Sequence, residues 1–470
     1  MATASRRDGG LGRGERLEGV RVTDPVALLR ALGDPEAVLL EDGRQAFAIL
    51  ALAPSARVVA TPGGPYRVER AGAGAEEIAD RGPAGLRRAL TLAGAVRRPA
   101  FGYLGYPYAA RVERLPLLAD DRPDVAFLVP GLLLRVDVHR GGEVTVLGEA
   151  DPEALREVVR AAAAVAASGP RAVAPPPADA RLVMPDLADH RDSVLAAVDA
   201  IRRGETFQIV VGRPFRVERP GAALDAYDRL RVHRAGYGGY VHVAGMRLAS
   251  ASPELLVARR GRRIRTMPIA GTRPRGRSVA EDRRLRAELL ADPKERAEHA
   301  MLLDLGRNDL GRVARYGTVS VTSSFRVGVH PTVLHITSHV AATLAPDKDS
   351  VDLVSAVFPA GTVSGAPKVR AMELIAELEP AARGPYAGGF GYVAADGATR
   401  LAITLRTAVF SAKTPERAEV WAGGGIVFRS DPAAEAVEIQ AKARTVIGSC
   451  WPGAASQTAP LASTAVAARS

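Results

Sequence analysis

The sequence has little cysteine and no long apolar segment. Cys450 is the only cysteine among 470 residues, which excludes an internal disulfide and a metal site built from several cysteines. No uninterrupted apolar run of about 18 residues occurs, and the polar first residues lack the apolar stretch of a secretory signal. We therefore expect a soluble, cytoplasmic protein that contacts no membrane.

Acidic residues are in the minority. The chain has 63 Lys and Arg against 52 Asp and Glu, a net charge of +11. Such an excess can indicate nucleic acid, a membrane surface or a small anionic substrate. The arginines are spread along the whole chain, which favours the small anionic substrate. A nucleic-acid-binding protein is the alternative from another class, and strong salt-dependent DNA binding would support it.

The chain divides into two blocks. Residues 1–18, 161–181 and 450–470 have the Gly-, Ala-, Pro- and Ser-rich composition of disordered ends and a linker. They delimit a first block over 19–160 and a second over 182–449. Helical and strand patterns both occur without a repeat of fixed period, so we expect an α+β fold.

Two helices of the second block have clear starts. Asp292 is the expected N-cap of the first, with Pro293 in its first turn, and this helix should run to about residue 313. The second begins at Asp431 and Pro432 and should end near residue 447. A further helix is expected over 189–203 and strands over 209–211, 255–257 and 319–321.

These two helices carry paired acids. Glu295 and Glu298 share one face of the first helix, and Glu435 and Glu438 share one face of the second, with Lys442 a further turn on. If the helices approach each other, the carboxylates need protons or a cation, and Mg²⁺ prefers such oxygen ligands. The alternative from spacing alone is a set of solvated acids paired with basic neighbours.

Glycine is dense over 384–391 and 423–425. Backbone without side chains lets an anion approach amide groups, and Lys368, Arg406 and Lys442 could complete a pocket for a carboxylate. The alternative is ordinary turns and bulges. His335 lies in an alternating segment, where a lone histidine is more often structural than catalytic.

Five longer strings together resemble the chorismate-utilising enzymes, of the anthranilate synthase large-component type. They cover 268–276, 292–299, 304–311, 358–368 and 383–392, and a weaker match extends over 102–116 of the first block. The resemblance implies a fold in which antiparallel β-sheets form a sandwich core flanked by helices. It also implies a Mg²⁺-dependent lyase that acts on chorismate.

The resemblance assigns the acidic residues. Glu298 and Glu438 match the family's Mg²⁺ ligands, with Glu295 close by, and the ion would draw electrons from the ring of chorismate. Glu254 matches the general acid that protonates the departing C4 hydroxyl as a nucleophile adds at C2. Such an acid must stay protonated near neutrality, so we expect a raised pKa.

Other positions match groups around the substrate. His335 matches the histidine near the reacting ring that is implicated in the loss of pyruvate, and His335 and Thr362 together favour full conversion. The positions that match those holding the two carboxylates are Thr272, Tyr392, Arg406, Gly423, Gly424, Gly425 and Lys442.

Two positions discriminate among the family's reactions. Isochorismate and salicylate synthases have a lysine base where this chain has Gln208, whose amide cannot take a proton from water, whereas ammonia needs no deprotonation. Aminodeoxychorismate synthases have a lysine nucleophile where this chain has Ala270. We therefore expect amination at C2 and loss of pyruvate to give anthranilate, in primary or specialised metabolism. The nearest alternative stops at 2-amino-2-deoxyisochorismate, and a non-catalytic chorismate sensor is a third.

The resemblance also bears on partners and regulation. Cys450 lacks the setting of a glutaminase nucleophile, so ammonia would come from a separate glutamine amidotransferase subunit or from free ammonium, in a homo- or hetero-oligomer. Tryptophan-regulated members carry Leu-Leu-Glu-Ser and Asn-Pro-Ser-Pro-Tyr-Met strings; this chain has Leu-Leu-Glu-Asp at 39–42 and Arg-Ala-Gly-Tyr-Gly-Gly at 234–239. Arg400 replaces a common Asp and Ala436 a common Tyr. We expect no tryptophan feedback.

Overall fold

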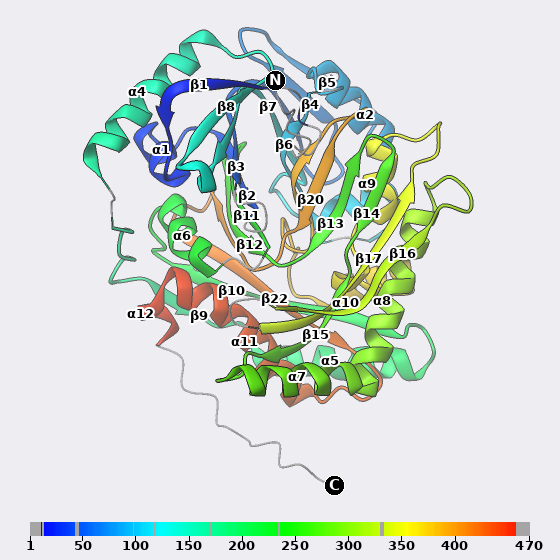
Figure 1. Cartoon of the computed structure of the whole chain (residues 1–470). Helices are drawn as coiled ribbons and strands as arrows, with labels where there is room; N and C mark the ends of the chain where they lie inside the picture. Colours follow the sequence, from blue (N-terminus) through cyan, green and yellow to red (C-terminus); the bar gives the residue numbers. More distant parts are fainter. Residues whose placement is uncertain are drawn as a thin grey trace.

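The computed structural model describes residues 11, 14–42, 47–96, 98–116, 118–169, 172–233, 236–329 and 333–456. Within these residues 22 strands form one hydrogen-bonded network, and every strand pairing is antiparallel. Helices pack around this network (Figure 1). The expected α+β class with antiparallel sheets is therefore confirmed.

The first block, in blue and cyan, lies at the top of Figure 1. Its elements are β1 (Gly14–Arg21), α1 (Pro25–Ala31), β2 (Ala37–Asp42), β3 (Phe47–Ala60), β4 (Tyr66–Arg70), β5 (Ala75–Ile78), α2 (Pro83–Leu92), β6 (Ala100–Leu104), η1 (Tyr106–Tyr108), α3 (Ala109–Val112), β7 (Val125–Asp137), η2 (Val138–Arg140), β8 (Glu143–Leu147) and α4 (Pro152–Ser168).

The second block supplies the remaining elements, with β10, β22, α5 and α11 towards the bottom of Figure 1. These elements are β9 (Arg181–Val183), α5 (Leu187–Arg202), β10 (Gln208–Glu218), α6 (Ala223–Leu230), η3 (Arg231–His233), β11 (Tyr237–Val243), β12 (Met246–Ser252), β13 (Leu255–Arg260), β14 (Arg263–Thr266), β15 (Ile269–Pro274), α7 (Val279–Ala291), α8 (Pro293–Gly311), β16 (Ser320–Val329), β17 (Val333–Thr343), α9 (Ser350–Val357), η4 (Gly361–Val363), β18 (Gly365–Ala366), α10 (Lys368–Leu378), β19 (Gly389–Val393), β20 (Thr399–Ile403), β21 (Thr407–Ser411), β22 (Arg417–Ile426), α11 (Pro432–Cys450) and α12 (Pro452–Ala455).

The two blocks share strands and core. β2 of the first block pairs with β11 of the second, and β6 pairs with β19. The largest apolar cluster accordingly contains Val58 and Phe127 from the first block beside Ile209 and Leu401 from the second. Burial of apolar surface between the blocks therefore stabilises both of them together.

The structure differs from the expected boundaries of the two disordered ends and of the linker. α4 runs to Ser168, well into the expected linker, because alanine favours helix and Ala161 and Ala162 are buried on its inner face. β1 begins at Gly14, inside the segment expected to be disordered. At the other end, α11 continues to Cys450 and α12 follows, held by Trp451, whose fully buried indole donates to the Pro220 carbonyl at 2.7 Å.

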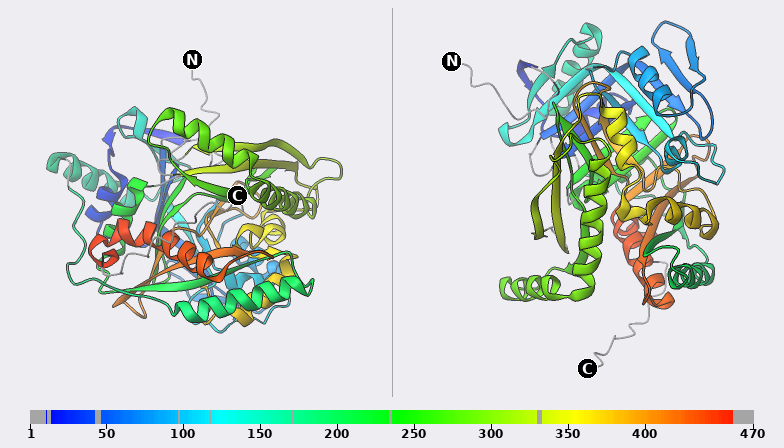
Figure 2. Two further views of the ribbon diagram at one scale, coloured as in Figure 1. Left: turned by 90° about the horizontal axis from the view of Figure 1, so that it is seen from below. Right: turned by 90° about the vertical axis from the view of Figure 1, so that its right-hand side faces the viewer.

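The two acid-bearing helices start where their caps predict. The Asp292 carboxylate accepts from the amides of Lys294 and Glu295 at 2.9 and 3.2 Å. Asp292 also ends α7, and the two helices are turned sharply relative to each other at this residue (Figure 2). Asp431 caps α11 in the same way, accepting from the Ala434 amide at 2.8 Å. In the described part of the chain, no helix combines the length and apolarity needed to cross a membrane.

Candidate active site

Three consecutive glycines of β22 let functional side chains approach the backbone. β22 pairs with β10, so Gly425 lies opposite Val210 and Gly423 opposite Gly212. A Cβ on Gly424 would lie 2.8 Å from Oε2 of Glu435, and one on Gly425 would lie 2.4 Å from Nε2 of Gln208. Larger residues at these positions would displace those groups.

Carboxylates from α8 and α11 meet at these glycines. A Cβ on Gly425 would lie 3.7 Å from Oε1 of Glu298, and one on Gly424 would lie 3.9 Å from Oε1 of Glu438. Burial raises the pKa of Glu298, and the negative charges of Glu295 and Glu438 raise it further. The structure therefore brings the three expected metal-binding acids into one electrostatically coupled group.

A fourth acid, Glu435, belongs to this group, although the sequence only showed that it shares a helix face with Glu438. Glu435 is 7% exposed, and its Oε2 has no hydrogen-bond partner among the residues that the structure describes. Burial raises its pKa, and the Glu438 charge adds to this. A buried carboxylate oxygen without a donor fits a cation that is held there when the site is loaded.

Basic side chains hold two of the four acids. Lys442 contacts Oε1 of Glu438 at 2.7 Å and donates to the Gly423 carbonyl at 2.9 Å, while Arg273 donates to Glu295 at 3.0 Å. In this arrangement, the described residues contain no cluster of three or more His, Cys, Asp or Glu that is placed to hold a metal. Mg²⁺ needs only one or two protein carboxylates, because water and substrate oxygens supply its other ligands.

Glu254 lies in the turn between β12 and β13 and is only 5% exposed. Burial raises its pKa to about 8, although the Thr362 hydroxyl, which donates to Oε1 at 3.0 Å, opposes the change. The backbone amide of Ile269 has the same lowering effect. The carboxyl is therefore largely protonated at neutral pH and can donate a proton.

His335 is fixed by a bulge between β15 and β17. The pairing shifts register between Ala270 and Thr272, and Gly271 between them has a φ of +62°, which glycine adopts without strain. Nδ1 of His335 lies 3.0 Å from the Gly271 carbonyl oxygen and 3.1 Å from Oγ1 of Thr272. A carbonyl only accepts, so Nδ1 carries the proton and Nε2 is basic in the neutral ring.

Tyr386 joins the site, although it was missed in the sequence. Its hydroxyl would lie 2.9 Å from a Cβ on Gly423, and its ring stacks on Trp421 at 5.7 Å between centroids. Burial raises the pKa of Tyr386 to about 12, although the charges of Arg383 and, more weakly, Arg406 oppose this. Tyr386 thus provides a hydroxyl beside the glycines, and Arg406 lies close enough to interact with it electrostatically.

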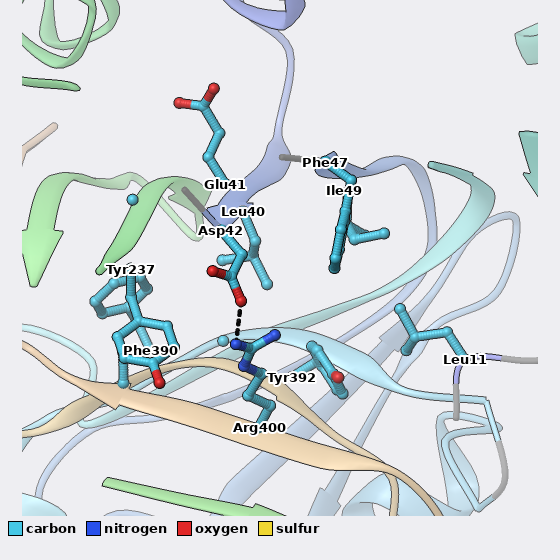
Figure 3. Close-up of a pocket in the computed structure, with 13 residues that line it drawn as sticks. Leu11, Leu40, Glu41, Asp42, Phe47, Ile49, Tyr237, Phe390, Tyr392 and Arg400 are labelled. Carbon is cyan, nitrogen blue, oxygen red and sulfur yellow. Dashed lines mark hydrogen bonds and ion pairs between the residues drawn. The ribbon is translucent and has the colours of Figure 1, made fainter. Parts of the chain in front are cut away.

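Tyr392 is not brought to this group. It lines a separate cavity of about 50 Å³, packs on Phe101 at 5.4 Å and lies beside Arg400 (Figure 3). Tyr386 and Tyr392 occupy the same sequence string, and no spacing rule distinguished them.

Residues from both strings that differ from the tryptophan-regulated members line this cavity, namely Leu40, Glu41 and Asp42 of the first and Tyr237 and Gly238 of the second. Asp42 on β2 lies opposite Tyr237 on β11, and Asp42 forms an ion pair with Arg400, whose guanidinium lies 5.1 Å over the Tyr237 ring. Figure 3 shows this pair between the aromatic walls, with Leu11 at the side. Arg234 and Ala235 of the second string lie outside the described residues.

The site combines a buried protonated acid, clustered carboxylate oxygens and cations along a bare backbone. These groups are suited to acid-catalysed chemistry on a small anionic molecule, and carboxylate oxygens are the ligands that a divalent ion prefers. A model of the chorismate binding enzymes matches residues 35–448. The chain belongs to this family, as its sequence motifs indicated.

Individual relatives agree with the family. The anthranilate synthase component 1 of Streptomyces coelicolor is 44% identical over 378 residues, which cover 74% of this chain and 71% of that protein. The anthranilate synthase component 1 of Thermus thermophilus is 42% identical over 354 residues, covering 74% of this chain and 76% of that protein.

Solved structures have the same fold. Anthranilate synthase component I from Streptococcus pneumoniae superposes with a TM-score of 0.72 at 31% identity, covering 86% of this chain and 93% of that one. The menaquinone-specific isochorismate synthase from Escherichia coli gives a TM-score of 0.68 at 20% identity, covering 93% and 95%, and supports the fold alone.

Proposed function

We propose that this enzyme aminates chorismate at C2 with ammonia and eliminates pyruvate to give anthranilate, as the synthase component of an anthranilate synthase. The observation that carries the choice of nucleophile is the position of Gln208, whose Nε2 donates to Oε1 of Glu298 at 3.2 Å. Relatives that add water at C2 need a base at this point, and an amide cannot serve as one. Ala270 likewise offers no amine for a covalent adduct with the ring.

The acid cluster is our candidate Mg²⁺ site. Glu298 and Glu438 would bind the ion, and Glu295 and Glu435 would hold its water ligands; the unpartnered oxygen of Glu435 supports this assignment. When bound, Mg²⁺ would neutralise the ring carboxylate and withdraw electron density from the ring.

The chain's own groups then have distinct tasks. Lys442, Arg406, Tyr386 and the backbone of 423–425 bind the two carboxylates of chorismate. Glu254 gives its proton to the C4 hydroxyl, which leaves as water while ammonia adds its electron pair at C2.

His335 acts in the elimination step. Because its Nδ1 proton is held by the Gly271 carbonyl, Nε2 can take the C2 proton as the C3–O bond breaks and pyruvate leaves. The name component 1 of the relatives implies a partner that supplies ammonia, for which we propose a glutamine amidotransferase.

The test is incubation of the purified chain with chorismate, Mg²⁺ and ammonium, followed by identification of the products by mass. We expect anthranilate and pyruvate. Glu254→Gln should lower the rate by about 10²-fold or more, whereas Asp304→Asn, an exposed residue of α8 paired with Arg307, should not change it. Release of 2-amino-2-deoxyisochorismate would limit the function to the first step, and isochorismate would refute amination.

A further inference from the structure

Glu254 also faces a small cavity that is lined neither by the glycines 423–425 nor by the four acids Glu295, Glu298, Glu435 and Glu438. The cavity has a volume of about 20 Å³, which is enough for one water molecule. It lies between α8, η4 and the β12–β13 turn. None of the residues to which we assign substrate or metal binding lines it; its lining includes Glu254, Thr362, Leu302, Leu305, Gly306 and Asp309.

The cavity follows one face of α8. Leu302, Leu305, Gly306 and Asp309 are spaced at i, i+3, i+4 and i+7, so they line about 10 Å of the helix. Most of this wall is apolar. Two acids line the cavity: Glu254 lies beside the active site, and Asp309 lies further along α8.

Asp309 is anchored near the protein surface. Its Oδ1 accepts from Nζ of Lys368 at 2.8 Å, and the same ammonium donates to the Val357 carbonyl at 3.2 Å. The side chains of Asp309 and Lys368 are 13% and 11% exposed, so solvent reaches them. Burial raises the pKa of Asp309, while the Lys368 charge opposes this, which makes the carboxyl a better proton carrier than a free aspartate.

The proposed reaction leaves Glu254 without its proton. The C4–O bond breaks, the hydroxyl departs as water with that proton, and the ammonium group formed at C2 later releases a different proton. A bound ring would cover the active-site side of Glu254 until product leaves. A proton delivered through the cavity on the other side would restore Glu254 without waiting for product release.

We propose that Asp309 and the water-sized cavity along α8 return a proton from solvent to Glu254 after each turnover. This inference rests on the proposed function. Asp309 touches no reacting atom and acts through Glu254. Lys368 holds the Asp309 carboxylate at the outer end of the path, which gives the strings at 304–311 and 358–368 a function that substrate binding does not explain.

Asp309→Asn tests the path by stopped-flow measurement of anthranilate formation with chorismate, Mg²⁺ and ammonium. The first turnover should keep the wild-type rate, because Glu254 starts protonated, and later turnovers should slow about tenfold or more. Millimolar formate, a small acid, should restore the steady-state rate. kcat/KM for chorismate should not change, so KM should fall in proportion to kcat, and Asp304→Asn on the same helix should behave as wild type.

A second variant separates this path from a folding defect. Asp309→Asn leaves the Lys368 charge without its partner, so Asp309→Asn/Lys368→Met removes both charges together. The double variant should show the same burst and the same rescue by formate. A steady-state rate equal to wild type, or a loss that already affects the first turnover and resists formate, would overturn the proposal. A wild-type chain that makes no anthranilate would instead refute the proposed function.

Discussion

Replacing Thr362 by valine should extend activity to higher pH. The Thr362 hydroxyl donates to Oε1 of Glu254 and stabilises the charged carboxylate. This hydrogen bond lowers the pKa of Glu254, whereas burial raises it, and the result is a pKa of about 8. A hydrogen bond to a charged group contributes about 1.5–3 kcal/mol, whereas one to the neutral acid contributes about 1 kcal/mol. The difference, roughly 0.5–2 kcal/mol, corresponds to an increase of about one pKa unit when the hydroxyl is lost.

The direction of the shift in the pH profile depends on which protonation state of Glu254 is active. The protonated acid donates to the leaving hydroxyl, so wild-type activity should fall as pH rises through about 8. In Thr362→Val, the alkaline limb of kcat should lie about one pH unit higher. Total ammonium must be adjusted at each pH so that free ammonia stays constant.

Thr404→Val is the matched control. Its hydroxyl is buried and has no hydrogen-bond partner among the described residues, so its removal should leave the profile as in wild type. An alkaline limb in Thr362→Val that stays in place or moves to lower pH would show that Glu254 is not the acid whose protonation limits the rate.

Three further predictions concern the other parts of the site. Tyr386→Phe should raise KM for chorismate about tenfold, the loss of one hydrogen bond to a charged group, whereas Tyr392→Phe should leave initial rates within twofold of wild type. Glu435→Gln should weaken Mg²⁺ activation about 10- to 100-fold, measured by titrating Mg²⁺ at saturating chorismate; an unchanged titration would remove Glu435 from the metal site. Tryptophan at micromolar concentration should not inhibit, because the Asp42–Arg400 ion pair occupies the cavity between the aromatic walls; strong inhibition would contradict this.

The parts of the fold set by local chemistry were predictable from the sequence. The starts of α8 and α11 depend on Asp292 and Asp431, whose carboxylates accept from amides two or three residues further on. A contact of this range is visible in any short window. The pairing of Glu435 with Glu438 on one helix face is equally local, and only the absence of a donor for Oε2 required the structure.

Other features depend on partners that are distant in the chain. Tyr386 and Tyr392 both lie in one glycine-rich string. What separates them is that Tyr386 precedes β19 and stacks on Trp421, whereas Tyr392 lies within β19. The Ala-rich part of the expected linker became helix because Ala161 and Ala162 found a buried face to pack on. No pattern within the segment identifies such a face.

The pKa values of Glu254 and Glu298 are both raised, but the causes differ. Burial raises the pKa of Glu254, and no neighbouring charge is among the causes, so burial keeps this carboxyl protonated. The pKa of Glu298 is raised by burial and by the charges of Glu295 and Glu438. A divalent cation would neutralise those two charges, so Glu298 would become a charged ligand. A cation bound at these acids would favour the deprotonated form of Glu298, whereas the burial that keeps Glu254 protonated would be unchanged. One active site can then hold an acid and a metal ligand of the same chemical type, because packing governs one and charge governs the other.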